Sequence, residues 1–357
     1  MRELILDTNA HKPMCQKALK AFNDFNNSFA AYGHAMSPNG PGRAAAEVLE
    51  ESRGKIARLL GAKPGQIFFT STCTQACEWA VVMMNRLSAG RTVHWSPAEH
   101  PAIKYAVKKN ILNRYEIPVN SDGVIEIDSL NLQDIVCIHM QNEIGIIQPI
   151  EKLNPKYLLS DMSQSAGKLE INLSSLPVDI AVFGAHKFGG PTSVGFIYIK
   201  KNEYWMEFGT GSRYYTDRTG TPDVAGIVAT AAALEDAMAT LPERKEKMIE
   251  FKNVLEPGLM EMGFNIIGLN AERCPNTTFV HMPDGKGLIA TLALGEHGIH
   301  VGLGSACGAA HTGTNPLMSK LGYDGESHDF MRISQFGEYG ADDARVFLDS
   351  LKKCLQN

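Results

Sequence analysis

Short apolar segments alternate with amphipathic segments over the first two thirds of the chain. Apolar residues three and four positions apart predict a helix over residues 42–60, which should end at Gly61 and Pro64. Residues 66–70 (QIFFT) are a compact apolar run that predicts a buried strand, and residues 74–87 predict a second helix. Five further apolar runs predict strands at residues 91–96, 134–140, 156–161, 179–185 and 194–200. This alternation predicts an α/β fold.

The pattern changes near Thr240. A long charged segment over residues 242–263 predicts a helix that introduces a smaller α+β domain. At 357 residues the chain is long enough for two closely packed domains, and its 44% of hydrophobic residues is ordinary for a protein with a sizeable core.

Charge and cysteine content exclude some classes of protein. The formal net charge of −5 argues against a nucleic-acid-binding surface, for which a basic face is expected. No run approaches the roughly 20 apolar residues of a membrane helix, so we expect no membrane partner. The N-terminus lacks the pattern of a secretory signal, and seven cysteines at irregular spacing indicate free thiols. We therefore expect a cytoplasmic protein.

Polar residues at the ends of the predicted strands are the first candidates for chemistry, because ligands gather at the carboxyl ends of strands in open α/β sheets. Lys187 lies in a glycine-rich turn between two apolar strands, where desolvation would make it a carbonyl nucleophile. A solvated loop lysine is the commoner situation for such a residue taken alone. Asp161 follows another strand and at that depth needs a cationic partner, such as a protonated pyridine nitrogen. An ordinary helix cap is its alternative role.

Two predicted helix starts add further candidates. Residues 71–75 (STCTQ) open a helix whose free amides would suit a phosphate, although a plain Ser/Thr cap has the same pattern. His100 also begins a helix and could stack on an aromatic cofactor or simply pack. Cys73 and Cys77 form a CxxxC pair, which is a weak metal signal and is more typical of helix packing, so no metal site is expected.

The order of these residues along the chain resembles that of a known family. Over nearly its whole length the sequence is similar to the class V pyridoxal-phosphate enzymes, and within them to the cysteine desulfurases of the NifS/IscS type. The segments that carry the resemblance are FTSTCTQA, SPAEHPAI, HMQNEIGIIQPI, SDMSQSAGKLEI, VDIAVFGAHKFGGPTSVGFIYI, DRTGTPDVAGIVA, GSACGAAHTG and MRIS.

The resemblance implies a fold of type I, like that of aspartate aminotransferase. Its large domain, expected over residues 14–240, holds a mostly parallel sheet. A small α+β domain combines residues 1–13 with residues 241–357. The resemblance also implies a homodimer with the active site at the subunit boundary.

The resemblance assigns roles to the candidates. Lys187 would hold pyridoxal 5′-phosphate as a Schiff base and move the α-proton of the substrate. Asp161 would pair with the ring nitrogen and Gln164 would bind the phenolic oxygen. His100 would stack on the ring and, as a catalytic residue, could assist proton transfers. The phosphate would be held by Thr74, His186 and, from a second subunit, Thr221. The implied cofactor-binding set is Cys73, Thr74, His100, Asp161, Gln164, His186, Lys187 and Thr221.

The implied reaction depends on Cys307. Flanked by small residues in a loop-like segment, this cysteine would attack the sulfur of L-cysteine, keep it as a persulfide and release L-alanine. A small buried thiol is the structural alternative. Asn142 and Arg332 would bind the substrate carboxylate. The sulfur would pass to an acceptor protein, and the sequence does not distinguish iron–sulfur assembly, tRNA thiolation and DNA phosphorothioation.

Several positions depart from the family's pattern. Gly184 replaces a serine that would contact the phosphate, His11 and Lys12 replace threonines near the substrate entrance, and Glu338 replaces an arginine. These differences keep two other interpretations open. One is a different class V reaction, such as that of a selenocysteine lyase or an aminotransferase. The other is a non-catalytic scaffold that binds a sulfur acceptor.

Overall fold

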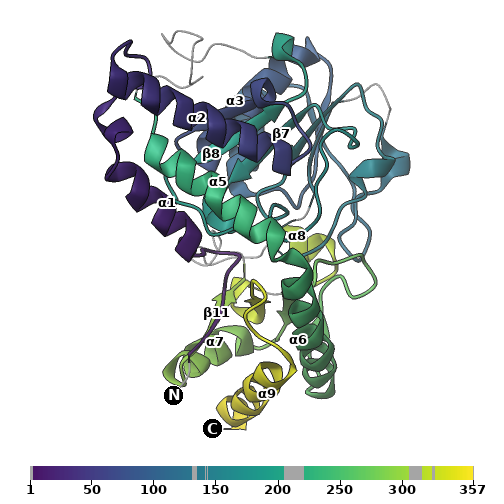
Figure 1. The fold of residues 1–357 in the computed structure, drawn as a ribbon. Coiled ribbons are helices and arrows are strands. Elements are labelled where there is room, and N and C mark those ends of the chain that lie inside the picture. The colour runs from purple at the N-terminus through teal and green to yellow at the C-terminus, as the bar shows by residue number, and fades with distance from the viewer. Residues whose placement is uncertain are drawn as a thin grey trace.

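The fold was obtained as a computed structural model of the 357-residue chain. It describes residues 3–130, 135–140, 142, 144–204, 221–304, 316–323 and 326–356. Figure 1 shows a broad upper part built on one sheet and a lower part built on a second sheet.

The larger sheet has seven strands in the order β2-β8-β7-β6-β5-β3-β4. Neighbouring strands from β7 to β4 run parallel, whereas β8 is antiparallel to both β7 and β2. The sheet is therefore mostly parallel. The strands are β2 (Ile67–Thr70), β3 (Val93–Trp95), β4 (Arg114–Glu116), β5 (Ile135–His139), β6 (Tyr157–Asp161), β7 (Ile180–Gly184) and β8 (Gly195–Ile199).

Alternate side chains of the central strands enter two different cores. On β7, Ala181 and Phe183 join one buried cluster, and Ile180 and Val182 join another. Successive side chains of a strand point to opposite faces of the sheet, and here both faces are covered. The sequences of these strands are therefore continuously apolar. One cluster includes residues of α1 (Gln16–Asn26), α2 (Gly40–Leu59) and α5 (Val224–Ala239), and the other includes residues of α3 (Cys73–Ser88) and α4 (Pro101–Asn110).

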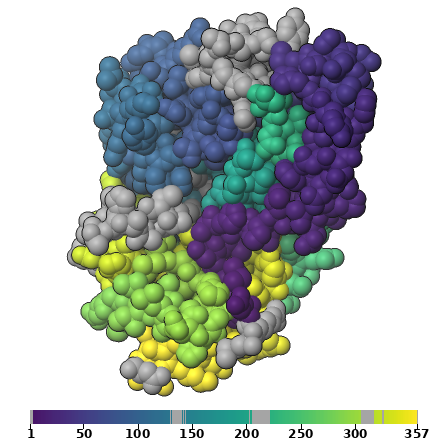
Figure 2. Space-filling model, turned by 90° about the vertical axis from the view of Figure 1, so that its left-hand side faces the viewer, coloured from purple at the N-terminus to yellow at the C-terminus, as the bar shows by residue number. Residues whose placement is uncertain are grey.

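The second sheet has five strands in the order β1-β11-β12-β10-β9. Its first strand comes from the start of the chain and lies parallel to β11, so the two ends of the sequence meet in one sheet. Figure 2 shows the N-terminal segment (purple) running over the molecule onto the part that the C-terminal segments (green and yellow) form. The strands are β1 (Leu4–Leu6), β9 (Asn265–Ile266), β10 (Thr277–His281), β11 (Ile299–Leu303) and β12 (Phe330–Ser334).

Helices α6, α7 and α9 pack with this sheet around a third core. The helices of this half are α6 (Leu241–Glu261), α7 (Lys286–Glu296), α8 (Pro316–Lys320) and α9 (Ala341–Gln356). The short 3-10 helices are η1 (Phe29–Tyr32), η2 (Pro64–Gln66), η3 (Ile127–Ser129), η4 (Ile150–Lys152), η5 (Ala185–Lys187), η6 (Asn202–Tyr204) and η7 (Ser327–Asp329).

The elements expected from the sequence are confirmed, with ends that differ by one or two residues. The α/β fold and its mostly parallel sheet are as expected. The division into residues 14–240 and the remainder stays a prediction. Among the helices of the described residues, none alone has the length and hydropathy to span a membrane, and α5 and α6 pass that test only as a pair bent by 63°.

Candidate functional site

The carboxyl ends of β5, β6 and β7 lie at one edge of the large sheet, because these strands are parallel neighbours. Asp161 is the last residue of β6, and Gly184 is the last residue of β7. The turn that follows β7 is η5, which carries His186 and Lys187. The expectation that polar groups gather at this edge is therefore confirmed for Asp161, His186 and Lys187.

Lys187 lies against the N-terminal segment. Its side chain is half-buried, and its Nζ donates to the carbonyl oxygens of Asn9 at 2.8 Å and Ala10 at 2.9 Å. These two carbonyls orient the amine at the turn that follows β7. An amine becomes a nucleophile once it loses a proton.

Gln164 is placed beside Lys187 by the same carbonyl. Its Nε2 donates to Asn9 O at 2.9 Å, so the amide of Gln164 and the amine of Lys187 share one acceptor. The buried Nζ of Lys168 donates to Oε1 of Gln164 and, at 3.0 Å, to Oδ1 of Asn9. Because Oε1 of Gln164 accepts from Lys168, Nε2 is the side of the amide that faces the backbone oxygen of Asn9, to which Lys187 also donates.

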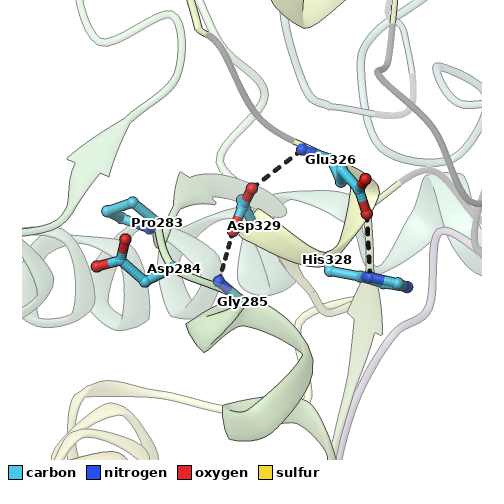
Figure 3. Close-up of a pocket in the computed structure, with 6 residues that line it drawn as sticks. All are labelled: Pro283, Asp284, Gly285, Glu326, His328 and Asp329. Carbon is cyan, nitrogen blue, oxygen red and sulfur yellow. Dashed lines mark hydrogen bonds and ion pairs between the residues drawn. The ribbon is translucent and has the colours of Figure 1, made fainter.

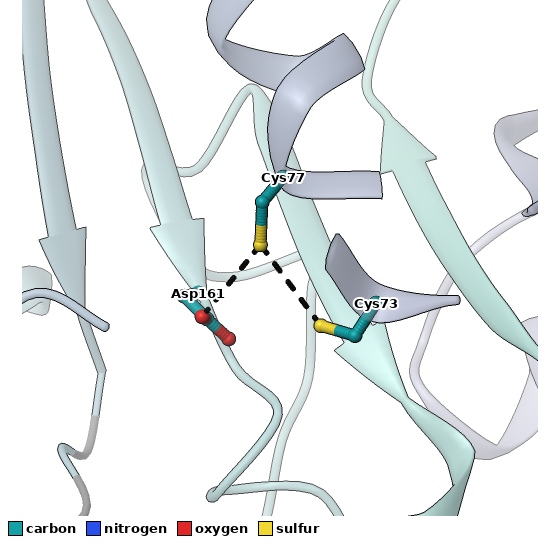
Figure 4. Close-up of side chains that lie close together, drawn as sticks. All are labelled: Cys73, Cys77 and Asp161. Carbon is teal, nitrogen blue, oxygen red and sulfur yellow. Dashed lines mark hydrogen bonds between the residues drawn. The ribbon is translucent and has the colours of Figure 1, made fainter. Parts of the chain in front are cut away.

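Asp161 is a buried carboxylate, with 3% of its surface exposed. Its Oδ1 accepts from the backbone N–H of Ser163 at 2.9 Å, which is the local turn contact of a capping residue. Its Oδ2 lies 4.0 Å from the sulfur of Cys77, as Figure 4 shows. Burying a carboxylate is costly unless a positive charge or several donors compensate it, and a protonated ring nitrogen would supply that charge.

Two helix starts face this edge. Thr72 caps α3 by accepting from the backbone N–H of Gln75 at 3.1 Å, and Cys73 and Thr74 form the first turn, with Thr74 exposed. A first turn offers backbone N–H groups to an anion such as a phosphate. His100 caps α4, and its Nδ1 accepts from Ala102 N at 3.2 Å. Both predicted helix starts are thus confirmed, while their cofactor roles stay predictions.

Gly195 lets α3 approach the sheet closely. A Cβ at this position would lie 2.5 Å from the backbone carbon of Thr72 and 2.6 Å from the nitrogen of Cys73. Any larger residue would therefore push the first turn of α3 away from β8, and would displace the N–H groups that the turn presents.

His186 lies in a cationic environment. Its pKa is lowered to about 4, mainly by burial and in addition by the charges of Lys187, His11, Lys168 and His100. Its ring stacks on that of His11, with centroids 6.1 Å apart. Several basic side chains around a turn at a strand end are suited to an anionic ligand.

This shift predicts a pH dependence of stability for the cofactor-free protein. The pKa of His186 in the fold lies below its ordinary value of 6.5, so the unfolded chain binds a proton that the folded chain does not. The free energy of unfolding should therefore fall as the pH drops from about 6.5 to about 4. We expect His186→Asn to flatten this slope in urea unfolding, while His297→Asn, at an exposed position, leaves it unchanged.

Asn142 and Arg332 are both buried polar residues. Oδ1 of Asn142 accepts from the backbone N–H groups of Ile144 and Ile146, whereas its buried Nδ2 has no hydrogen-bond partner among the described residues. Arg332, on β12, is fully buried, and its Nη2 contacts Oδ1 of Asp7 at 2.8 Å. An unsatisfied amide donor and a fixed guanidinium are suited to a carboxylate ligand.

Two departures from the family's pattern contact each other. Nζ of Lys12 pairs with Oε1 of Glu338 at 2.6 Å and lies 4.6 Å from the centre of the Phe336 ring. Position 338 thus carries a negative charge where the family's pattern has a positive one, and the positive charge of Lys12 pairs with it. At Gly184, a Cβ would lie 3.1 Å from Cβ of Cys73 and 3.2 Å from Cε1 of His186, so a serine there would require a neighbour to shift.

Two predicted residues are not placed in the site by the structure. Cys307 lies in residues 305–315, outside the described residues. Thr221 is the first described residue after 205–220 and is exposed, so its expected reach into a second subunit stays a prediction.

Sequence reasoning missed Asn9 and Lys168. Lys168 belongs to the segment SDMSQSAGKLEI quoted above. Its position four residues after Gln164 was the signal that could have identified it. Asn9 acts largely through its backbone carbonyl, for which a side-chain pattern gives no signal.

A pocket away from these residues lies between the segment that follows β10 and the segment that precedes β12. It has a volume of about 440 Å³ and is lined by Pro283, Asp284, Gly285, Glu326, His328 and Asp329 (Figure 3). Its Asp329 accepts from the backbone N–H groups of Gly285 and Glu326. This carboxylate thus holds two loops together, which is a structural role.

The fold and the arrangement of Asp161, Gln164 and Lys187 define a pyridoxal-phosphate enzyme of the α/β type. The chain belongs to the aminotransferase class-V family, whose model matches residues 4–343. Its cofactor is pyridoxal 5′-phosphate, and the buried carboxylate, the amide and the amine at the sheet edge fit that group.

Relatives and solved structures agree with this assignment. The chain is 28% identical to a cysteine desulfurase IscS of Dictyoglomus turgidum over 99% of its own length and 95% of the relative. It is 29% identical to a cysteine desulfurase of Sinorhizobium fredii over 90% and 88% of the two chains. A solved NifS-like protein superposes with a TM-score of 0.89 at 29% identity, covering 99% of this chain and all of that one. The apo cysteine desulfurase of Thermococcus onnurineus has the same fold, with a TM-score of 0.84 at 20% identity over 99% and 95%.

Proposed function

We propose that the protein is a cysteine desulfurase, which converts L-cysteine to L-alanine and passes the sulfur to an acceptor protein. The observation that carries this proposal is the shared acceptor of Lys187 and Gln164, in a chain similar over nearly its whole length to cysteine desulfurases. It places an amine and an amide donor side by side near a buried carboxylate, as the chemistry requires.

When bound, pyridoxal phosphate supplies an electron sink that makes the α-proton of an amino acid acidic. Nζ of Lys187 would hold the cofactor through its aldehyde and, once the substrate amine displaces it, would accept that proton. Asp161 would stabilise positive charge on the ring nitrogen, and Nε2 of Gln164 would donate to the phenolic oxygen. His100 would stack on the ring and could assist proton transfers. Lys168 and Asn9 keep the Gln164 donor in place.

The substrate carboxylate is bound by Asn142 and Arg332. Nδ2 of Asn142 gains the partner that it lacks among the described residues. The guanidinium of Arg332 is held by Asp7 and offers further N–H groups to the carboxylate. Together they orient the α-carbon of the substrate toward Lys187.

The first turn of α3 would hold the phosphate. Its donors would be the backbone N–H groups of Cys73 and Thr74, the Thr74 hydroxyl and the ring of His186. Thr221 of a second copy would complete the set, so the proposal includes a homodimer. It also includes action in the cytoplasm.

Cys307 captures the sulfur. Its thiolate attacks the substrate sulfur, and a sulfur–sulfur bond forms while the carbon–sulfur bond breaks. The electron pair of the broken bond stays on the β-carbon, which takes up a proton, and the return of a proton to the α-carbon then gives alanine. The persulfide on Cys307 then transfers its outer sulfur to the acceptor.

The test is the release of alanine and sulfide from L-cysteine in the presence of a thiol reductant. We expect equal yields of both products from the wild type and the loss of both in Cys307→Ala, with the cofactor still bound. Cys354→Ala, at a half-buried thiol near the C-terminus, is the matched control and should keep full activity. Undiminished turnover in Cys307→Ala would contradict the proposal and favour another class V reaction.

A further inference from the structure

Two cysteines and the site carboxylate form a compact cluster, drawn in Figure 4. The sulfurs of Cys73 and Cys77 are 4.0 Å apart, and that of Cys77 is 4.0 Å from Oδ2 of Asp161. The three ligand atoms all lie within 4.8 Å of one another. We propose that Cys73, Cys77 and Asp161 bind a soft divalent cation such as Zn²⁺ when the cofactor is absent.

The spacing of the two sulfurs needs little adjustment to accept a cation. Cys73 and Cys77 are four residues apart in α3, so their side chains leave the same face of the helix. A tetrahedral zinc ion with Zn–S bonds of about 2.3 Å places its two sulfurs about 3.8 Å apart. The observed separation of 4.0 Å is therefore within a few tenths of an ångström of the required one.

A position for a fourth ligand also exists. The hydroxyl of Ser163 lies 3.0 Å from the sulfur of Cys73, and its backbone N–H already contacts Asp161. This hydroxyl, or a water molecule that it orients, completes a four-coordinate site of two sulfurs and two oxygens.

Because the ligands are buried, the positive charge of the ion contributes strongly to its binding. Cys77 and Asp161 are almost inaccessible to solvent, so negative charge on them is costly without a cation. Binding releases the two thiol protons to solvent and leaves two thiolates and one carboxylate around a dication. Thiolate ligands select zinc and cadmium over magnesium and calcium, which prefer oxygen.

The cation site shares Asp161 with the cofactor site. One carboxylate oxygen cannot both ligate a dication and pair with a protonated ring nitrogen, because the two cations would repel each other at this distance. Zinc and pyridoxal phosphate therefore exclude each other, and each weakens the binding of the other by the same factor. The cation site itself does not depend on the desulfurase reaction.

The first experiment titrates the full-length, cofactor-free Cys307→Ser protein with Cd²⁺ under anaerobic conditions. The thiolate-to-cadmium charge-transfer band in the ultraviolet reports binding. We expect one equivalent to bind, and we expect Cys77→Ser to weaken binding by at least about 100-fold. Cys354→Ser is the matched control and should bind as before. Cys73→Ser provides a second test at a half-buried position, in case Cys77→Ser does not fold.

A second experiment measures how fast the cofactor rebinds, from its visible absorbance. One equivalent of Zn²⁺ should slow rebinding in the Cys307→Ser protein but not in its Cys77→Ser derivative, and a chelator should restore the rate. A charge-transfer band that survives both cysteine variants, or that never forms, would overturn the cation site. The same holds for a Cys73–Cys77 disulfide found by mass spectrometry in the anaerobic protein. If zinc binds without slowing rebinding, the sharing of Asp161 is wrong.

Discussion

Replacing Lys187 by alanine should lower the rate of alanine formation from L-cysteine by at least about 10³-fold, because in the proposed mechanism this one side chain both holds the cofactor and moves the proton. The structure gives the physical reason: the amine is fixed by two backbone carbonyls of the N-terminal segment. A solvent molecule in its place would lack this orientation. The measurement is product formation in a single turnover, together with the absorbance of the bound cofactor.

Two further variants sharpen this prediction. Lys187→Arg keeps the positive charge but cannot bond to an aldehyde, so we expect it to be as inactive as the alanine variant. Lys20→Ala, at an exposed lysine of α1 that pairs with Asp24, should retain wild-type activity. Activity of Lys187→Arg near the wild-type level would contradict the assigned role, because charge alone would then suffice.

Replacing Arg332 by lysine should raise the KM for L-cysteine by about 100-fold, with a much smaller effect on kcat. The guanidinium is fully buried, and Asp7 fixes one of its nitrogens. An ammonium group cannot contact both Asp7 and a substrate carboxylate in the same planar arrangement. Steady-state kinetics separate the two parameters, and the absorbance of the bound cofactor should not change.

The matched variant for this prediction is Asp7→Asn, which keeps an oxygen acceptor for Arg332 but removes its charge. We expect an intermediate increase in KM, since the guanidinium is then less firmly held. An unchanged KM in Arg332→Lys would show that the substrate carboxylate binds elsewhere.

Much of the fold follows from local patterns. The apolar runs that became β6, β7 and β8 have both faces buried, so their strands were visible as continuous hydrophobic segments. Asp161 and Lys187 could be singled out for the same reason, since each follows such a run. Arg332 had no such signal, and only the resemblance to a family identified it.

The remaining features depend on contacts between distant parts of the chain. Asn9 contacts Gln164, Lys168 and Lys187, all far along the sequence, and two of these contacts use its backbone oxygen. The CxxxC spacing was visible, but Asp161 joins it only through the packing of α3 against the sheet. The pairing of Lys12 with Glu338 could not be predicted from the sequence either, because each residue taken alone was a single difference from the family's pattern.

The parallel pairing of β1 with β11 has a consequence for folding during synthesis on the ribosome. Strand β1 leaves the exit tunnel long before residues 299–301 are made, and it must wait for them before it can pair with β11. Until then, the segment that leads to the carbonyls of Asn9 and Ala10, which accept from the amine of Lys187, lacks its neighbour in the second sheet. We therefore expect incomplete nascent chains to be unable to take up the vitamin-derived cofactor, whatever its concentration in the cell.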